Sequence, residues 1–424
     1  MIKKLTIKNY KTIDKLSLDL GRVTVLIGEN GAGKSNILEA IALAGAACSN
    51  KLDNEFLKAR GIRVSDEPNL MRSALQASND EPEPIEVVLE SQNDCRAKFL
   101  ISHDNVPYPE WKSKISYDGK QSSPDLVDLL NDMFYGGDLD STTKREAALS
   151  LKKLFNKMGE MAKSDNPQGE WEKYLHGEFL KELKEGHPLY DHVASNSDRM
   201  NEIAAPLSKF IIYSPENSSL RSTEKTSAIE PLGNKGEGLL KLLYVISKIE
   251  KREILETIKN NLKLLGWFSD FSVNLETSGY GLEIKDRHLE ECNLSFDQNA
   301  ANEGFMFLLF YFSLFSTPIT PTFFAVDNID TSLNPKLCQR LIQQLVKLAK
   351  SANKQVILTT HNPAILDGLN LDDEEQRLFT ISRGRNGQTK ASRIMKPKEL
   401  SGAPELRLSE MFLRGLFGGL PKGF

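Results

Sequence analysis

The chain has 424 residues, of which 40% are hydrophobic and 26% charged, and its formal net charge is −4. This length suits two to three domains or one large α/β domain with insertions. The mild negative net charge shows that the chain as a whole is not a polycation. The four cysteines stand far apart without a C-x-x-C pair, which argues against a zinc site or a disulfide framework. Because the chain lacks a membrane-length apolar run and a signal-peptide core, we expect a cytoplasmic protein without a membrane partner.

The N-terminal part, residues 1–102, has the pattern of a mixed α/β unit rich in strands. Alternating apolar and polar residues, or short apolar runs, predict its strands, and one longer apolar-rich stretch predicts a helix. The strands are expected at 2–9, 15–20, 23–27, 85–89 and 96–102, and the helix at 36–47.

Between the third strand and the helix, residues 28–35 read GENGAGKS and fit the pattern G-x-x-x-x-G-K-[ST]. With a strand before and a helix after, such a loop closes its backbone N–H groups around a triphosphate. Lys34 can then reach the β- and γ-phosphates, and the Ser35 hydroxyl can ligate Mg²⁺. The sequence therefore predicts a site for ATP and Mg²⁺. Its ATP-binding residues are expected to include Asn30, Gly31, Ala32, Gly33, Lys34, Ser35 and Asn36.

Residues 103–205 differ in texture, with frequent proline and charge, and we expect a mainly helical insertion there. Its helical patches are predicted at 124–133, 143–162 and 170–185. The insertion either packs on the core or forms an arm that contacts a partner or DNA, and both can hold. It lacks a long heptad array, which argues against an extended coiled coil. Its basic pairs suit solvated helix faces, so DNA binding stays open.

The α/β texture returns in residues 206–424, so the two parts are expected to form one split domain. Strands are predicted at 210–213, 271–275, 281–284, 322–326 and 355–359, and helices at 236–254, 304–315 and 335–350. The strand before Asp327 is typical of a Walker B strand, which presents a carboxylate to the Mg²⁺ shell. His361 follows the last strand, where the chain leaves the sheet.

These motifs resemble the RecF/SMC branch of the ABC ATPases. The resemblance is carried by NYKTIDKLSLDLGRVTVLIGENGAGKSNILEAI at 9–41, DNIDTSLNP at 327–335 and TTHNP at 359–363. Residues 213–221 and 232–243 resemble compact members with a helical insert in place of a coiled coil. The resemblance implies a P-loop NTPase fold of the ABC/SMC-head type, an α/β mixed sheet with helices interrupted by a mainly helical insertion.

In that family two heads sandwich two ATP molecules, each between the P-loop of one subunit and the signature motif of the other. The resemblance thus implies a homodimer or higher oligomer. It assigns the signature acting in trans to Asn302 and Gly304, the D-loop to Asp330, the switch histidine to His361, and a basic residue near the phosphates to Lys11. The family usually has Ser where Asn302 stands, but an amide can still donate to a γ-phosphate.

The larger departure is Asn328, because the family places a Glu directly after the Walker B Asp to polarise the attacking water. An amide can hold a water but has no basic lone pair of useful pKa, and losing general-base help typically costs about 10²–10⁴-fold in rate. Lys34, Ser35 and Asp327 would still hold Mg²⁺-ATP. We therefore expect ATP binding and dimerisation around ATP, with Asn328 and His361 at the catalytic position and weak or absent hydrolysis.

Compact ATPases of this class commonly partner a nuclease. The residues after His361 are too few for a fused Toprim domain, and they lack a carboxylate cluster for two metals, so we expect any nuclease to be a separate chain. The overall plan resembles anti-phage defence ATPases, above all the PtuA-type subunits of Septu systems, which act with an HNH nuclease. The ATPases of PARIS systems, with a Toprim effector, are a nearby alternative.

Two other functions stay open. A RecF-like DNA-repair ATPase would hydrolyse ATP in a DNA-stimulated manner, which Asn328 disfavours. A transport ATPase subunit fits less well, because the chain has no clear LSGGQ motif and has RecF/SMC-like N-terminal strands.

Overall fold

The computed structural model describes residues 1–64, 71, 83–103, 111–117, 120–121, 157, 202–223, 231–248, 252–277, 279–292, 294–396 and 406–418. The helical patches expected at 124–133, 143–162 and 170–185 lie outside these residues, Lys157 excepted. Among the helices that the structure describes, none combines the length and the apolar character needed to cross a bilayer.

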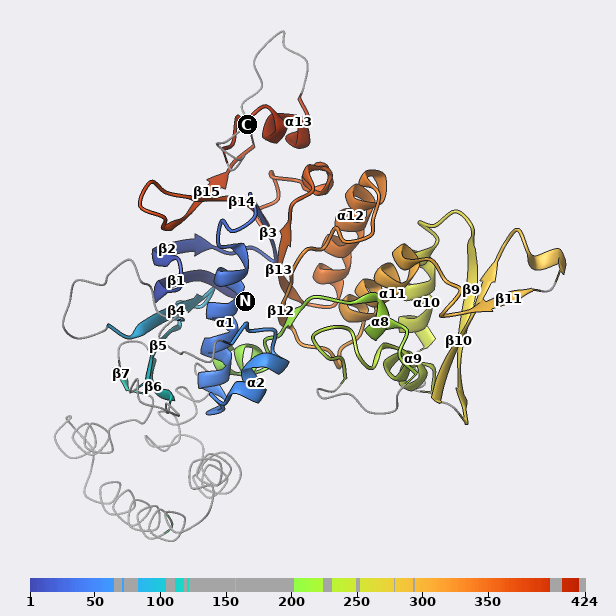
Figure 1. Ribbon diagram of the computed structural model, residues 1–424, viewed down its shortest axis with the longest axis horizontal. Coiled ribbons are helices and arrows are strands. Elements are labelled where there is room, and N and C mark those ends of the chain that lie inside the picture. Colours follow the sequence, from blue (N-terminus) through green and yellow to red (C-terminus); the bar gives the residue numbers. More distant parts are fainter. Residues whose placement is uncertain are drawn as a thin grey trace, which may run out of the picture.

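A mostly parallel sheet forms the centre of the molecule, with the strand order β15-β14-β3-β13-β12-β8 (Figure 1). Its strands are β3 (Val23–Ile27), β8 (Ile212–Tyr213), β12 (Phe323–Val326), β13 (Gln355–Thr360), β14 (Gln376–Arg383) and β15 (Thr389–Ile394). All neighbours are parallel except β15, which pairs antiparallel with β14. Because β3 lies between β13 and β14, distant parts of the chain build one sheet.

A second sheet is antiparallel and has the order β2-β1-β4-β5-β6-β7. Its strands are β1 (Ile2–Tyr10), β2 (Ile13–Asp19), β4 (Ile85–Ser91), β5 (Arg96–His103), β6 (Trp111–Tyr117) and β7 (Lys120–Gln121). The last two lie in the stretch that the sequence assigns to a mainly helical insertion. They pair with β5 and with each other, so the sheet continues past residue 102.

Helix α1 (Lys34–Cys48) lies between the two sheets (Figure 1). It is buried on nearly every side, which explains why its run of alanine and leucine shows little amphipathic pattern. Leu26 and Ile357 of the central sheet and Val87 and Phe99 of the antiparallel sheet join α1 in one apolar core.

The other face of the central sheet packs against a second core built around α11 (Glu303–Ser316). Val25 and Leu358 point into it, while Leu26 and Ile357 point toward α1, as alternation along a strand requires. The surrounding elements are α9 (Leu239–Lys248), α10 (Arg252–Leu262), α12 (Pro335–Ser351), β9 (Phe268–Glu276), β10 (Gly279–Asp286) and β11 (Ser295–Asp297). Helices α1 and α11 therefore cover opposite faces of one sheet (Figure 1).

Element types predicted from the sequence agree with the structure in most places, and the boundaries differ for local reasons. The helix expected at 236–254 begins only at Leu239, because Gly236 and Gly238 adopt positive φ angles of 93° and 83°. A separate helix, α10, starts at Arg252. Several elements were not predicted, among them α2 (Asn54–Ala59), α8 (Asn217–Leu220), β11, β14, β15 and α13 (Leu408–Leu413).

Candidate nucleotide-binding site

The phosphate-binding loop depends on glycines at defined backbone angles. Gly33 is the N-cap of α1 with φ of 105°, and Gly31 has φ of 74°. A Cβ at Gly33 would lie 2.1 Å from Thr389 Oγ1, and one at Gly28 would lie 2.0 Å from the Ile381 carbonyl oxygen. The loop therefore needs glycine at 33 for both angle and space, and at 28 for space.

Lys34 folds back over the loop. Its Nζ donates hydrogen bonds to the carbonyl oxygens of Gly28 at 2.8 Å and Glu29 at 3.0 Å. Burial lowers the pKa of Lys34 to about 8, although the carboxylates of Asp327 and Asp330 act in the opposite direction. The ammonium group therefore lies inside the curve of the loop and is held by two neutral carbonyl oxygens of that loop.

Ser35 and Asp327 meet at the carboxyl end of the central strands. The Ser35 hydroxyl donates to Asp327 Oδ2 at 3.0 Å, and Thr359 donates to the other carboxylate oxygen. Asp327 follows β12 directly, and its N–H donates to the Tyr213 carbonyl at 2.8 Å. The expected Walker B carboxylate therefore lies beside the predicted Mg²⁺ ligand of the P-loop.

Asn328 is exposed and has a left-handed backbone with φ of 56°. Its N–H donates to Thr359 Oγ1 at 2.9 Å. Asn tolerates this conformation better than Glu does, because its short amide can form local hydrogen bonds. The left-handed backbone therefore favours Asn over Glu at position 328. The sequence shows that the carboxylate is missing but does not reveal this conformational preference.

The D-loop and switch residues are joined through β13. Thr360 Oγ1 donates to Asp330 Oδ1 at 2.6 Å. His361 is exposed, and its Nδ1 lies 3.5 Å from Lys34 Nζ. Although the side chain reaches solvent, partial desolvation of the ring, followed by the charge of Lys34, lowers the pKa of His361, so the imidazole is neutral at pH 7. Asp327, Asp330, Lys34 and His361 are therefore gathered at one end of the sheet.

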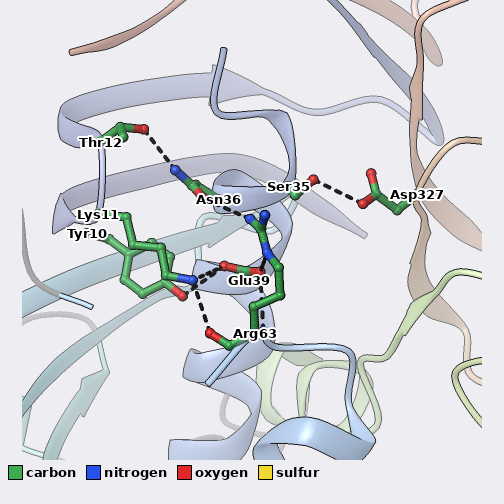
Figure 2. A network of polar contacts seen from close by, with 8 residues as sticks. All are labelled: Tyr10, Lys11, Thr12, Ser35, Asn36, Glu39, Arg63 and Asp327. Carbon is green, nitrogen blue, oxygen red and sulfur yellow. Dashed lines mark hydrogen bonds and ion pairs between the residues drawn. The ribbon is translucent and has the colours of Figure 1, made fainter. Parts of the chain in front are cut away.

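Lys11 pairs with a buried carboxylate that the sequence did not single out, and its role near the phosphates stays a prediction. Glu39, 1% exposed, accepts from Lys11 Nζ at 2.5 Å, from Arg63 Nε at 2.5 Å and from Tyr10 OH at 3.3 Å (Figure 2). Arg63 also donates to Asn36 Oδ1 at 3.1 Å. Only the folded chain brings these residues together, so no local pattern marks Glu39 or Arg63.

Asn36 and Thr389 tie the loop to neighbouring strands. Asn36 Nδ2 donates to Thr12 Oγ1 at 2.8 Å (Figure 2), and Thr12 Oγ1 lies 2.7 Å from Thr389 Oγ1. Thr389 Oγ1 is within 3.1 Å of the Ala32 carbonyl oxygen. The first turn of α1 and the loop before it are therefore fixed against β15.

The signature-like residues lie on the other side of the central sheet, at the start of α11. Asn302 is exposed and caps this helix, because its Oδ1 accepts from the Phe305 N–H at 2.8 Å. A Cβ at Gly304 would lie 3.4 Å from the Ser332 carbonyl oxygen. Since α1 and α11 cover opposite faces, the fold separates these residues from the P-loop of the same chain, and their role in trans stays a prediction.

The residues present fit ATP with Mg²⁺. The glycine loop, the Lys34 ammonium group and the N-terminus of α1 supply donors for phosphate oxygens. Among the residues described, no group of three or more His, Cys, Asp or Glu could hold a metal by itself. Mg²⁺ characteristically takes one or two protein oxygens plus substrate phosphates, and Ser35 and Asp327 would supply the former.

Fold and site together define a P-loop ATPase of the ABC/SMC-head type. The fold resembles that of an SMC head solved with the C-terminal winged-helix domain of ScpA, with a TM-score of 0.52 and 17% identity; the match covers 93% of this chain and 98% of that one. The chain belongs to the family described as "AAA ATPase domain", which matches residues 1–366.

Curated relatives point to the SMC/RecF-like branch of these ATPases. Structural maintenance of chromosomes protein 1 of Saccharomyces cerevisiae is 22% identical over 250 residues, which is 52% of this chain and 20% of that protein. RecF of Bacillus cereus is 35% identical over 79 residues, 18% of this chain and 20% of RecF. The OLD nuclease of Thermus scotoductus is 46% identical over 43 residues, 10% of this chain and 8% of the nuclease. The match therefore spans a fifth or less of each of these relatives.

Proposed function

We propose that this protein is an ATP-binding regulatory subunit that dimerises head to head around two ATP molecules and turns them over weakly or not at all. Lys34 would bind the phosphates, Ser35 and Asp327 would hold Mg²⁺, and Asn302 and Gly304 would contact the γ-phosphate bound to the other subunit. Binding across the joint would make ATP stabilise the closed dimer by mass action.

The observation that carries this proposal is Asn328 beside an otherwise complete set of phosphate and Mg²⁺ residues. Asn328 follows Asp327 directly in the chain, and its backbone N–H donates to Thr359 Oγ1 at 2.9 Å. An amide there can hold a water but cannot accept its proton at neutral pH, so hydrolysis loses general-base help. The neutral imidazole of His361 is exposed, and its Nδ1 lies 3.5 Å from Lys34 Nζ.

The regulated partner, in this proposal, is a separate nuclease in an anti-phage defence complex, most like the HNH nuclease that acts with PtuA in Septu systems. Two observations support it: the resemblance of the motif series, interrupted by the insertion expected at 103–205, to PtuA-type ATPases, and the similarity of a segment of the chain to the OLD nuclease of Thermus scotoductus. The ATPase would hold the nuclease under nucleotide control.

Sedimentation of the purified chain with Mg²⁺-ATP, with ADP and without nucleotide tests the proposal. We expect a dimer or higher oligomer only with ATP, and none for Lys34→Ala. A chain that stays monomeric at ATP concentrations that saturate the P-loop would contradict the sandwich.

An active RecF-like DNA-repair ATPase is the second candidate, favoured by the 35% identity to Bacillus cereus RecF over 79 residues. It requires phosphate release that duplex DNA stimulates. The same preparations, assayed with and without DNA, separate the two candidates.

A further inference from the structure

The signature-like segment is supported by a short polar pedestal built from α8 and Arg221. The Arg221 guanidinium donates to three backbone carbonyls just before the segment: those of Gln298, of Asn299 at 3.0 Å and of Ala301 at 2.7 Å. Its Nε donates to Asn217 Oδ1 at 2.8 Å. The planar guanidinium group of Arg221 therefore fixes the turn that leads into α11.

Glu303, the residue between Asn302 and Gly304, uses both of its carboxylate oxygens on different parts of the fold. Oε1 accepts from Asn217 Nδ2 at 3.1 Å, and Oε2 accepts from Ser332 Oγ at 2.8 Å. Asn217 belongs to the pedestal, whereas Ser332 belongs to the loop that begins with Asp327 and Asn328. This carboxylate thus bridges the signature-like segment and the Walker B loop.

The Walker B loop has a defined shape on the Ser332 side. Ser332 has a left-handed backbone with φ of 59°, as Asn328 does at the other end of the turn. Asp330, between them, is fixed by Thr360 at 2.6 Å. A change at the Mg²⁺ end of this loop therefore reaches Ser332 through a few constrained residues rather than through a flexible tether.

We propose that Glu303 is a positioning residue that couples the two halves of the ATP sandwich. Through Ser332 it senses the loop that contacts ATP in its own subunit, and through Asn217 and Arg221 it sets the segment that would contact ATP on the partner. The inference rests on the proposed function. Loss of the Glu303 carboxylate should therefore weaken dimerisation. Because Glu303 is exposed and lies outside the P-loop, folding and ATP binding by the monomer should stay unchanged.

Glu303→Gln is the first test, because the amide can accept only one of the two hydrogen bonds. Because the variant loosens the link between the two segments, we expect a roughly tenfold weaker ATP-dependent dimer, which corresponds to about 1.4 kcal/mol. ATP affinity measured at protein concentrations too low for dimerisation, and the melting temperature, should stay unchanged. Glu374→Gln is the matched control, since it makes the same chemical change at another exposed glutamate.

The double variant Asn217→Asp with Glu303→Gln exchanges donor and acceptor. The carboxylate introduced at position 217 then accepts both from Arg221 and from the side-chain amide introduced at position 303. The oxygen of that amide remains free to accept from Ser332. We expect the double variant to dimerise like the parent. If Glu303 only packed against the helix, exchanging donor and acceptor would not restore the dimer.

Sedimentation in Mg²⁺-ATP separates the outcomes. A weak Glu303→Gln dimer that the double variant restores supports the coupling. If the parent dimerises but Glu303→Gln dimerises equally well, the coupling alone is overturned. A double variant that dimerises as weakly as Glu303→Gln has the same meaning. A parent that remains monomeric with bound ATP overturns the coupling together with the proposed function.

Discussion

The Ser35 hydroxyl donates a hydrogen bond to the Asp327 carboxylate over 3.0 Å, although the two residues come from opposite ends of the split domain. This contact brings a hydroxyl and a carboxylate together beside the phosphate loop, the ligand types that Mg²⁺ uses when phosphates complete its shell. The central sheet enforces it, because β3 and β12 both flank β13 in parallel register.

Ser35→Ala should therefore weaken ATP binding in the presence of Mg²⁺ by at least about tenfold, the lower limit for losing even an outer-shell partner of a metal. Ser35→Thr retains the hydroxyl and should bind like the parent. Calorimetry with Mg²⁺ and with EDTA measures both. Equal weakening of Ser35→Ala with EDTA would show that Ser35 acts without the metal.

Lys34 should take up protons when ATP binds. Its pKa of about 8 leaves roughly half of the lysine neutral at pH 8 in the free protein, and phosphate charges restore the ammonium form. Calorimetry at pH 8 in buffers of different ionisation enthalpy should therefore report an uptake of about half a proton, and ATP affinity should fall as the pH rises above 8.

The nearby His361 provides the control for that uptake. Its pKa is lowered below the ordinary value, so ATP could also protonate it. His361→Gln should keep the uptake at pH 8 if Lys34 is its source. Loss of the uptake in this variant would assign the proton to the imidazole instead.

Thr389→Val should loosen the phosphate loop. Thr389 is 2% exposed, and its hydroxyl contacts the Thr12 hydroxyl at 2.7 Å and the Ala32 carbonyl at 3.1 Å. Leaving such partners unsatisfied costs about 1–3 kcal/mol, which urea unfolding measures. Thr389→Ser keeps the hydroxyl and should retain most of the stability. A Thr389→Val variant that is as stable as the parent would show that these hydrogen bonds do not stabilise the loop.

Sequence patterns predicted the elements that carry strong local signals. The glycine loop, the apolar strands expected at 322–326 and 355–359, and the helix after Lys34 each follow from spacing and apolar periodicity within a short window. The α/β fold of ABC/SMC-head type is confirmed by the SMC head that it resembles. Glu39, Thr389 and Glu303 could not be found in this way, because their partners are distant in the chain and no motif includes these contacts.

Asn328 was found from the sequence, but the sequence shows only part of what distinguishes it. The sequence shows the missing carboxylate, but its left-handed backbone, with φ of 56°, is visible only in the fold. Likewise, Gly236 and Gly238 shorten a helix that the apolar pattern alone extends.

Lys354 should make the stability of the protein depend on pH. It is 1% exposed, its Nζ donates to the Leu314 carbonyl at 2.7 Å and to Thr320, and burial lowers its pKa to about 7. Between pH 7 and about 10.4 the unfolded chain binds more protons at this group than the folded chain does. The contribution of Lys354 to the free energy of unfolding therefore rises with pH, by at most about 1.4 kcal/mol per unit.

Lys354→Met removes the titrating group while retaining an unbranched side chain of nearly the same length. Urea unfolding at pH 7 and pH 9 should show a smaller gain in stability for the variant than for the parent. An identical gain in both would place the pH dependence elsewhere.

ATP is a structural ligand in the proposed function because Asn328 supplies no general base. Steady-state phosphate release tests this in the parent and in Lys34→Ala, Asn328→Glu and Asn328→Gln. The last two share the cost of placing a longer side chain at φ of 56°, about 1 kcal/mol of stability, so only the carboxylate distinguishes them. We predict that the parent and Asn328→Gln release phosphate at the Lys34→Ala background rate while Asn328→Glu exceeds it by about 10²-fold or more. Robust release by the parent above that background would contradict a structural role for ATP and favour the DNA-repair ATPase.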